Sequence, residues 1–155
     1  MRVILHQAYV YDIASMAVSI GTGYPVSHAS IVQGDEVWDS NMARGHLDIN
    51  TFPEHEMDRT IMVFDFPQMD AKEFLLRNRG RKYDFLGIAL WFLHIHSKDR
   101  WYCFELISEC LRENGIEVMP KNHAVTGKVL FDFFTKNLGL TGKTGNTRQL
   151  LQGEL

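Results

Sequence analysis

Strand-like segments dominate the first half of this chain, and segments with helical spacing dominate the second. Between residues 60 and 66 the side chains alternate in the pattern of a pleated strand, whereas Val129, Leu130, Phe133 and Phe134 recur at helical intervals. Strands are predicted at 2–6, 27–32, 37–40, 46–49 and 60–66, with a hairpin turn at 33–36; helices are predicted at 12–20, 68–78, 84–93, 100–114 and 128–137. Strands grouped before helices predict an α+β fold.

The length of the chain fits one domain with a single core. It has 155 residues, of which 45% are apolar and 23% charged, a balance that argues against wholesale disorder. From residue 139 onward there are four glycines in 17 residues and only scattered leucines. We therefore predict a domain over residues 1–138 and a loosely ordered tail over 139–155.

Charge and hydropathy exclude two classes of protein. The net charge is −3 and the isoelectric point is near 6.1, which is atypical of a basic nucleic-acid-binding protein. The longest apolar run, residues 85–93, is far shorter than the roughly 20 residues of a membrane span. The apolar stretch at residues 3–5 is too short for a signal peptide, so we expect a cytoplasmic protein, or a virion-associated or host-cytoplasmic one if a phage encodes it.

The two cysteines lie on one predicted helix. Cys103 and Cys110 are seven residues apart, which in a helix separates their Cα atoms by about 10 Å, too far for a disulfide. Cys103 falls in the first turn, where unpaired N–H groups and the helix dipole stabilise a thiolate. It is a candidate nucleophile; the alternative is a buried core cysteine. Cys110, two turns further on, is predicted to be a core residue.

A histidine and an aspartate on neighbouring strands could complete a nucleophilic site. His28 begins an apolar strand after a Gly/Pro turn, where an imidazole suits general-base chemistry, although a surface histidine at a strand end is the simpler alternative. Asp39 lies on the returning strand, near the His28 end, and could orient the imidazole; the alternative is a solvated aspartate. Ser40, Asn41 and His46 are substitutes if the strand register differs by one residue.

Two further patterns do not meet the requirements of a metal or nucleotide site. His94, His96 and Asp99 lack a Cys pair or an HExxH pattern, so no metal is predicted. The segment 142–144 ends like a phosphate-binding loop, but Asn137 stands where the first glycine is required, and no strand is predicted before it. No cofactor is predicted.

Four segments, in order, resemble one hydrolase family. The predicted helix at 12–20 followed by residues 23–32 (GYPVSHASIV) resembles the N-terminal His motif of circularly permuted NlpC/P60 (YiiX-like) papain-fold hydrolases. Residues 102–106 (YCFEL) match that family's Tyr-Cys-Ser-Glu-Leu pattern at four of five positions, and residues 80–85 resemble its Gly-x-x-Tyr-Asp segment. The strand carrying Asp39 stands where the family has its third polar residue. The resemblance covers about residues 10 to 135.

The resemblance implies a small antiparallel sheet packed against helices, with the cysteine at a helix N-terminus facing the histidine on the sheet. It implies Cys103 as nucleophile, His28 as base and Asp39 as the orienting carboxylate. For the substrate and oxyanion pocket it implies Tyr83, Phe104 and Tyr24, with the Cys103 backbone N–H as an oxyanion donor. Phe104 departs from the family, which has a small serine there, and Asp39 is shorter than the family's usual glutamate.

The implied activity is hydrolysis of an amide or ester bond through a thioester intermediate. The substrate would be a small peptide, an acyl-amide or a lipid-like molecule; relatives cut peptidoglycan peptides or lipid-type amides and esters, and a compact version suits a bacteriophage. Two alternatives stay open: a non-catalytic papain-like assembly or binding module, such as a phage particle component, and a lipid acyltransferase that uses the same Cys–His pair. The sequence does not indicate an oligomeric state.

Overall fold

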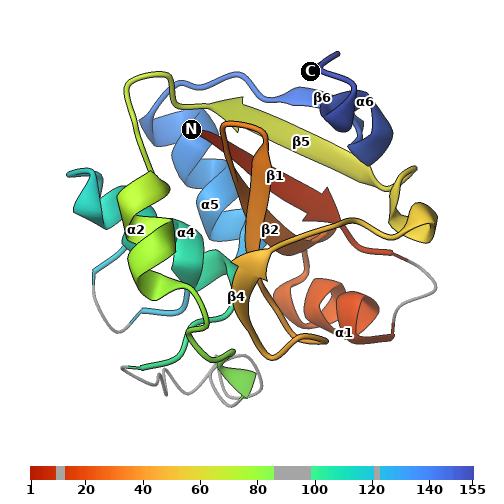
Figure 1. Cartoon of the computed structure of the whole chain (residues 1–155), viewed down its shortest axis with the longest axis horizontal. Coiled ribbons are helices and arrows are strands. Elements are labelled where there is room, and N and C mark those ends of the chain that lie inside the picture. The colour runs from red at the N-terminus through yellow and green to blue at the C-terminus, as the bar shows by residue number, and fades with distance from the viewer. Residues whose placement is uncertain (10–12, 86–98, 121–122) are drawn as a thin grey trace.

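A six-stranded antiparallel sheet forms the centre of the molecule (Figure 1). The computed structural model describes residues 1–9, 13–85, 99–120 and 123–155. The strand order is β4-β3-β2-β1-β5-β6, so the N-terminal strand β1 lies between β2 and β5. The strands are β1 (Arg2–Gln7), β2 (Val26–Gln33), β3 (Glu36–Asn41), β4 (His46–Ile49), β5 (Thr60–Asp65) and β6 (Lys143–Asn146).

Helices surround this sheet. The described ones are α1 (Ile13–Thr22), α2 (Lys72–Asn78), α4 (Cys103–Glu113), α5 (Gly127–Asp132) and α6 (Thr147–Leu151), with short turns η1 (Glu54–Glu56) and η3 (Phe133–Asn137). Helices α4 and α5 contact β2, and Figure 1 shows α2 beside α4. Strands in the first half and helices mainly in the second confirm the predicted α+β class and its antiparallel sheet.

Alternation along β1 divides the apolar interior into two clusters. Val3 and Leu5 join the larger cluster, which includes the buried sides of α4 and α5, whereas Ile4 joins a smaller one on the other face. Leu150 of α6 closes that smaller cluster together with Phe52. The sheet thus has an apolar cluster on each face.

The C-terminal segment differs from the expected loosely ordered tail. Residues 143–146 form β6, which pairs with β5, and α6 follows directly. The side chain of Asn146 accepts a hydrogen bond from the backbone N–H of Gln149 (2.9 Å) and caps α6. The carbonyl of Leu155 accepts a hydrogen bond from Arg2 (3.0 Å). This segment is ordered by backbone hydrogen bonds between β6 and β5. Such bonds require no alternation of apolar residues, so the sequence shows little sign of the strand.

Part of the predicted helical region lies outside the described residues. The prediction for 84–93 falls there except for its first two residues, as do the start of the predicted 12–20 helix and the pair His94 and His96. Within the described part of the chain, no helix has both the length and the apolar content that crossing a bilayer requires.

Candidate functional site

The N-terminus of α4 is the first component of the candidate site. Tyr102 is the N-cap residue and Cys103 the first residue of the helix. Two contacts hold this start: the backbone N–H of Tyr102 donates to the Glu105 carboxylate (3.3 Å), and the Tyr102 hydroxyl donates to the carbonyl of Val125 (3.0 Å). The backbone N–H of the first residue in a helix has no hydrogen-bond partner within the helix. The backbone N–H of Cys103 can therefore stabilise a nearby negative charge.

His28 lies against both Cys103 and Asp39. Its Nε2 is 2.8 Å from Asp39 Oδ2, and Cys103 lies close enough to the ring to raise the pKa of His28. Because Asp39 engages Nε2, Nδ1 is the ring nitrogen left for the sulfur. The structure therefore brings the three predicted catalytic residues together, from β2, β3 and the first turn of α4.

The surroundings of His28 favour its protonated form. Burial lowers the pKa of His28, since its side chain is only 16% exposed, but Cys103 and Asp39 outweigh this effect and raise the pKa to about 10. The imidazole thus carries a proton at neutral pH, held between a sulfur and a carboxylate.

Asp39 is completely buried and has three charged or polar partners. Besides His28, it accepts hydrogen bonds from Arg44 and from Asn50 Nδ2 (2.8 Å). Each carboxylate oxygen is therefore bonded, so the carboxylate cannot rotate freely away from the imidazole. Asp39 is the carboxylate that the sequence analysis favoured.

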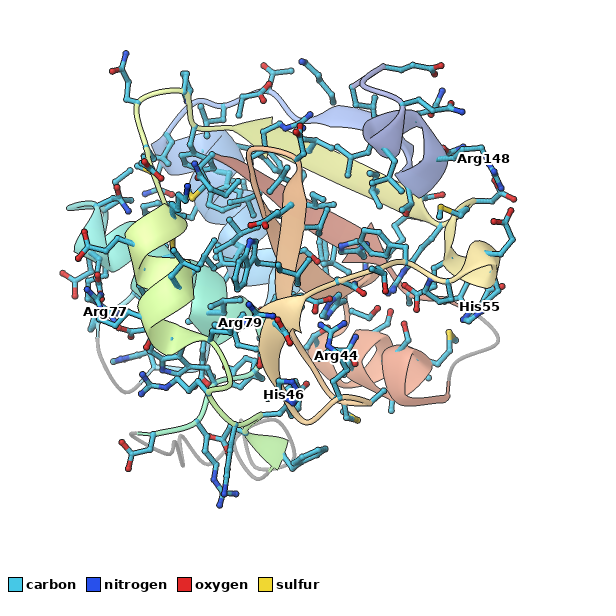
Figure 2. The ribbon with its side chains drawn as sticks, viewed as in Figure 1. Arg44, His46, His55, Arg77, Arg79 and Arg148 are labelled. Carbon is cyan, nitrogen blue, oxygen red and sulfur yellow. The ribbon has the colours of Figure 1, made fainter. Side chains whose placement is uncertain are left out.

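The three alternatives to Asp39 have other partners. Ser40 donates to the carbonyl of Trp101 (2.6 Å), and Asn41 Oδ1 accepts from the backbone of Ala43 (2.8 Å). His46 Nδ1 lies 2.8 Å from the carbonyl of Arg44; Figure 2 shows these two side chains at the same edge of the sheet. Of these four side chains, Asp39 is the one that forms an ion pair with His28.

A second histidine lies beside His28 and was not singled out by the sequence analysis. His6 on β1 is opposite His28 in the sheet, with ring centroids 5.3 Å apart, and is fully buried. Its Nε2 is 2.9 Å from Ser30 Oγ. Burial, with the nearby His28 and Arg59, holds the pKa of His6 well below its usual range, so this ring stays neutral.

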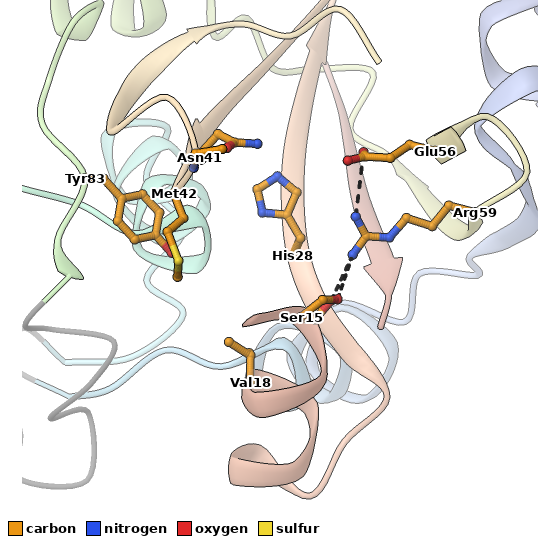
Figure 3. A pocket seen from close by; sticks show the side chains of 10 residues that line it. Ser15, Val18, His28, Asn41, Met42, Glu56, Arg59 and Tyr83 are labelled. Atoms are coloured by element: carbon orange, nitrogen blue, oxygen red, sulfur yellow. Dashed lines mark hydrogen bonds and ion pairs between the residues drawn. The ribbon is translucent and has the colours of Figure 1, made fainter. Parts of the chain in front are cut away.

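A pocket of about 250 Å³ opens in front of His28. Its lining combines polar and apolar side chains, with contributions from α1, the β3–β4 hairpin and the segment before β5. The residues are Ser15, Val18, Ser27, His28, Asn41, Met42, Ala43, Glu56, Arg59 and Tyr83. Figure 3 shows His28 between Tyr83 on one side and Arg59 on the other. Cys103 is 1% exposed and is not part of this lining.

The predicted pocket residues separate into two groups. Tyr83 lines the pocket, and burial, followed by the proximity of Cys103, raises the pKa of its hydroxyl well above the usual range, so it is a neutral donor. Phe104 is 2% exposed and packs in the core, with its ring edge-on to Tyr102. Tyr24 packs against Phe131 of α5 (centroids 5.6 Å apart) and is not among the lining residues.

Arg44, Asn50 and Arg59 were missed because nothing in the sequence marks them. Arg44 and Asn50 flank β4, and they reach Asp39 only because the β3–β4 hairpin folds them back. Arg59 precedes β5, and its side chain donates to Ser27 of β2, two strands away in the sheet. Polar residues beside strands are common, so their presence in the sequence does not predict these hydrogen bonds.

Among the residues that the structure describes, no group of three or more His, Cys, Asp or Glu side chains is arranged to hold a metal ion. His94 and His96, which the sequence analysis discounts as metal ligands, lie outside that part of the chain.

No protein-family model matches this chain, and no curated protein matches it significantly.

Proposed function

We propose that this protein is a cysteine hydrolase with a papain-like site of the circularly permuted NlpC/P60 type. One observation carries the proposal: Cys103, at the N-terminus of α4, lies close enough to His28 to raise the pKa of an imidazole whose Nε2 is bonded to a buried carboxylate. A thiol, an imidazole and an orienting carboxylate in this order are the arrangement that activates a sulfur nucleophile.

In the proposed reaction, the Cys103 sulfur attacks the carbonyl carbon of an amide or ester. The carbon–nitrogen or carbon–oxygen bond breaks, and the leaving group takes its proton from His28. His28 then takes a proton from a water molecule, whose oxygen attacks the thioester carbonyl carbon. The carbon–sulfur bond breaks, which releases the carboxylic acid and restores the Cys103 sulfur. Asp39 stabilises the imidazolium throughout, and the backbone N–H of Cys103 and the Tyr83 hydroxyl are the proposed oxyanion donors.

The burial of Cys103 favours a second candidate function. A sulfur that is 1% exposed and outside the pocket lining also suits a non-catalytic papain-like module, in which the Cys–His–Asp contacts serve stability alone. The two candidates differ in one consequence: only the hydrolase requires the sulfur to reach a carbonyl carbon.

A panel of chromogenic amides and esters, with peptide, acyl and lipid-like acyl groups, separates the two. We expect hydrolysis of at least one class and its loss, by about 10³-fold or more, in Cys103→Ala. Cys110→Ala is the matched control, since it removes the same atom from the same helix and should retain activity. Activity that survives in Cys103→Ala, or no turnover of any substrate by the native protein, contradicts the hydrolase proposal.

A further inference from the structure

Arg44 and Asn50 bind the Asp39 carboxylate from the two ends of β4. Arg44 lies in the turn between β3 and β4, and Asn50 directly follows β4. The guanidinium of Arg44 donates to Asp39 Oδ1 through Nη2 and to Asn50 Oδ1 through Nη1 (3.0 Å). Asn50 Nδ2 in turn donates to Asp39 Oδ2 (2.8 Å). The three side chains therefore form a closed ring of hydrogen bonds.

This ring determines how many donors each oxygen of Asp39 receives. Because Asn50 Oδ1 accepts from Arg44, the NH₂ group of the amide is the end that faces Asp39. Asp39 Oδ2 is thus shared by Asn50 Nδ2 and His28 Nε2, each at 2.8 Å, while Oδ1 receives Arg44. His28 therefore does not have the carboxylate to itself.

Two positive charges and one amide divide the single negative charge of Asp39. The side chain of Asp39 is completely buried and that of Arg44 is 28% exposed, so solvent screens these charges only in part. The guanidinium opposes the proton on His28, because both groups are positive and both are bonded to the same carboxylate. Removal of either Arg44 or Asn50 leaves more of the negative charge to act on the imidazolium.

The strength with which His28 holds its proton matters for the proposed reaction. His28 must give that proton to the leaving group, and an acid that holds its proton too firmly does so slowly. An amine leaving group depends on this step more than an alcohol, because it is the stronger base.

We propose that Arg44 and Asn50 are positioning residues that share the charge of Asp39 and thereby weaken its hold on the His28 proton. This inference rests on the proposed hydrolase function. It gives the hydrogen-bonded ring a role in proton release besides that of fixing Asp39.

NMR titration of the His28 ring tests the inference without turnover. Asn50→Ala and Arg44→Gln are each introduced into Cys103→Ala, so that the sulfur does not contribute to the titration. We expect the pKa of His28 to rise by about 0.5 or more in Asn50→Ala and by about 1 or more in Arg44→Gln. Arg79→Gln is the matched control, since it removes an exposed guanidinium that pairs with Asp48 of β4, and it should leave the pKa unchanged.

The direction of the change separates charge sharing from a merely structural role. If Arg44 and Asn50 only held Asp39 against His28, their loss would loosen this contact and lower the pKa of His28. A lower or unchanged pKa in Asn50→Ala overturns the inference, and this variant decides the case if Arg44→Gln does not fold. The variants leave the other titratable or charged side chains around His28 and its pocket in place, namely His6, Glu56, Arg59 and Tyr83.

Kinetics with Cys103 present separate this inference from the proposed function. On an amide and an ester with the same acyl group, Asn50→Ala should lower kcat/KM for the amide more than for the ester; equal losses contradict the inference. Hydrolysis that depends on Cys103, together with an unchanged or lower pKa in Asn50→Ala, overturns charge sharing and leaves the hydrolase intact. A raised pKa without hydrolysis of any substrate by the native protein overturns the hydrolase and leaves charge sharing.

Discussion

The two cysteines of α4 lie in different chemical surroundings. Cys103 begins the helix and lies close enough to His28 to raise the pKa of the imidazole. Cys110, two turns later, packs in the core with its sulfur 3.7 Å from Met1 Sδ. Burial, with a contribution from Glu113, raises the pKa of the Cys110 thiol to about 12, so it stays protonated at neutral pH.

Burial alone does not distinguish these thiols, because Cys103 is 1% exposed and Cys110 is completely buried. The difference lies in the partner: an imidazole held by a carboxylate at the helix N-terminus, against a thioether in the apolar interior. Position on the helix therefore separates a candidate nucleophile from a structural cysteine.

The largest expected effect is the loss of hydrolysis in Asp39→Asn, which removes the carboxylate beside the Cys103 site but not the surroundings of Cys110. An asparagine at this position would carry no negative charge to stabilise the imidazolium of His28, and its amide could favour the other ring tautomer, so hydrolysis should fall by about 10²- to 10⁴-fold. Steady-state assays on the substrate found in the panel measure this. Asp48→Asn is the matched control, since Asp48 lies opposite Asp39 on β4 and pairs with Arg79 instead. Equal losses in both variants would contradict a specific role for Asp39.

Alkylation by iodoacetamide at neutral pH compares the two sulfurs directly. We expect Cys103 to react at least about 10-fold faster than Cys110, because the thiolate is the reactive form and the Cys110 thiol is held protonated. Mass spectrometry of the peptides gives both rates, and unfolded protein, where the rates should converge, is the control. Slow labelling of both in the folded protein would favour the non-catalytic module.

The raised pKa of His28 predicts a dependence of stability on pH. A pKa of about 10 in the folded protein, against about 6.5 when unfolded, means that protonated His28 stabilises the fold fully below pH 6.5. This contribution is lost as pH rises through 10. The difference in unfolding free energy between the native protein and His28→Gln should decrease over that range, by at most about 5 kcal/mol. A difference that stays constant contradicts the raised pKa.

The smallest expected effect is that of Cys110→Ala on stability. Removing one buried sulfur leaves a small cavity beside Met1, which should cost about 1 kcal/mol in urea denaturation without changing the substrate preference. A change in substrate preference would contradict the assignment of Cys110 to the core.

The hydrophobic pattern of the sequence predicts most of the central sheet. The strand predicted at 46–49 is β4 without change, and those at 27–32 and 37–40 are each one residue short at both ends of β2 and β3. Their alternating apolar residues face a covered sheet, so the pattern is strong. Strand β6 was missed because residues 143–146 (KTGN) are polar and are ordered by backbone bonds to β5.

Within the candidate site, the tight hairpin turn between β2 and β3 predicts that Asp39 lies near the His28 end of the strand pair, and the two side chains are bonded in the structure. The partners of Asp39 could not, since Arg44 reaches it through a loop conformation that no local pattern specifies. The pocket lining was equally hidden: Ser15 and Arg59 are 44 residues apart and meet only in the folded chain.

The most direct test of the account is the pKa of His28, measured by NMR titration of its ring in the native protein, Cys103→Ala and Cys110→Ala. Sulfur and imidazole in contact predict a pKa near 10 in the native protein and in Cys110→Ala, and a clearly lower value in Cys103→Ala. A pKa of His28 that does not change when Cys103 is replaced would contradict the Cys–His pair.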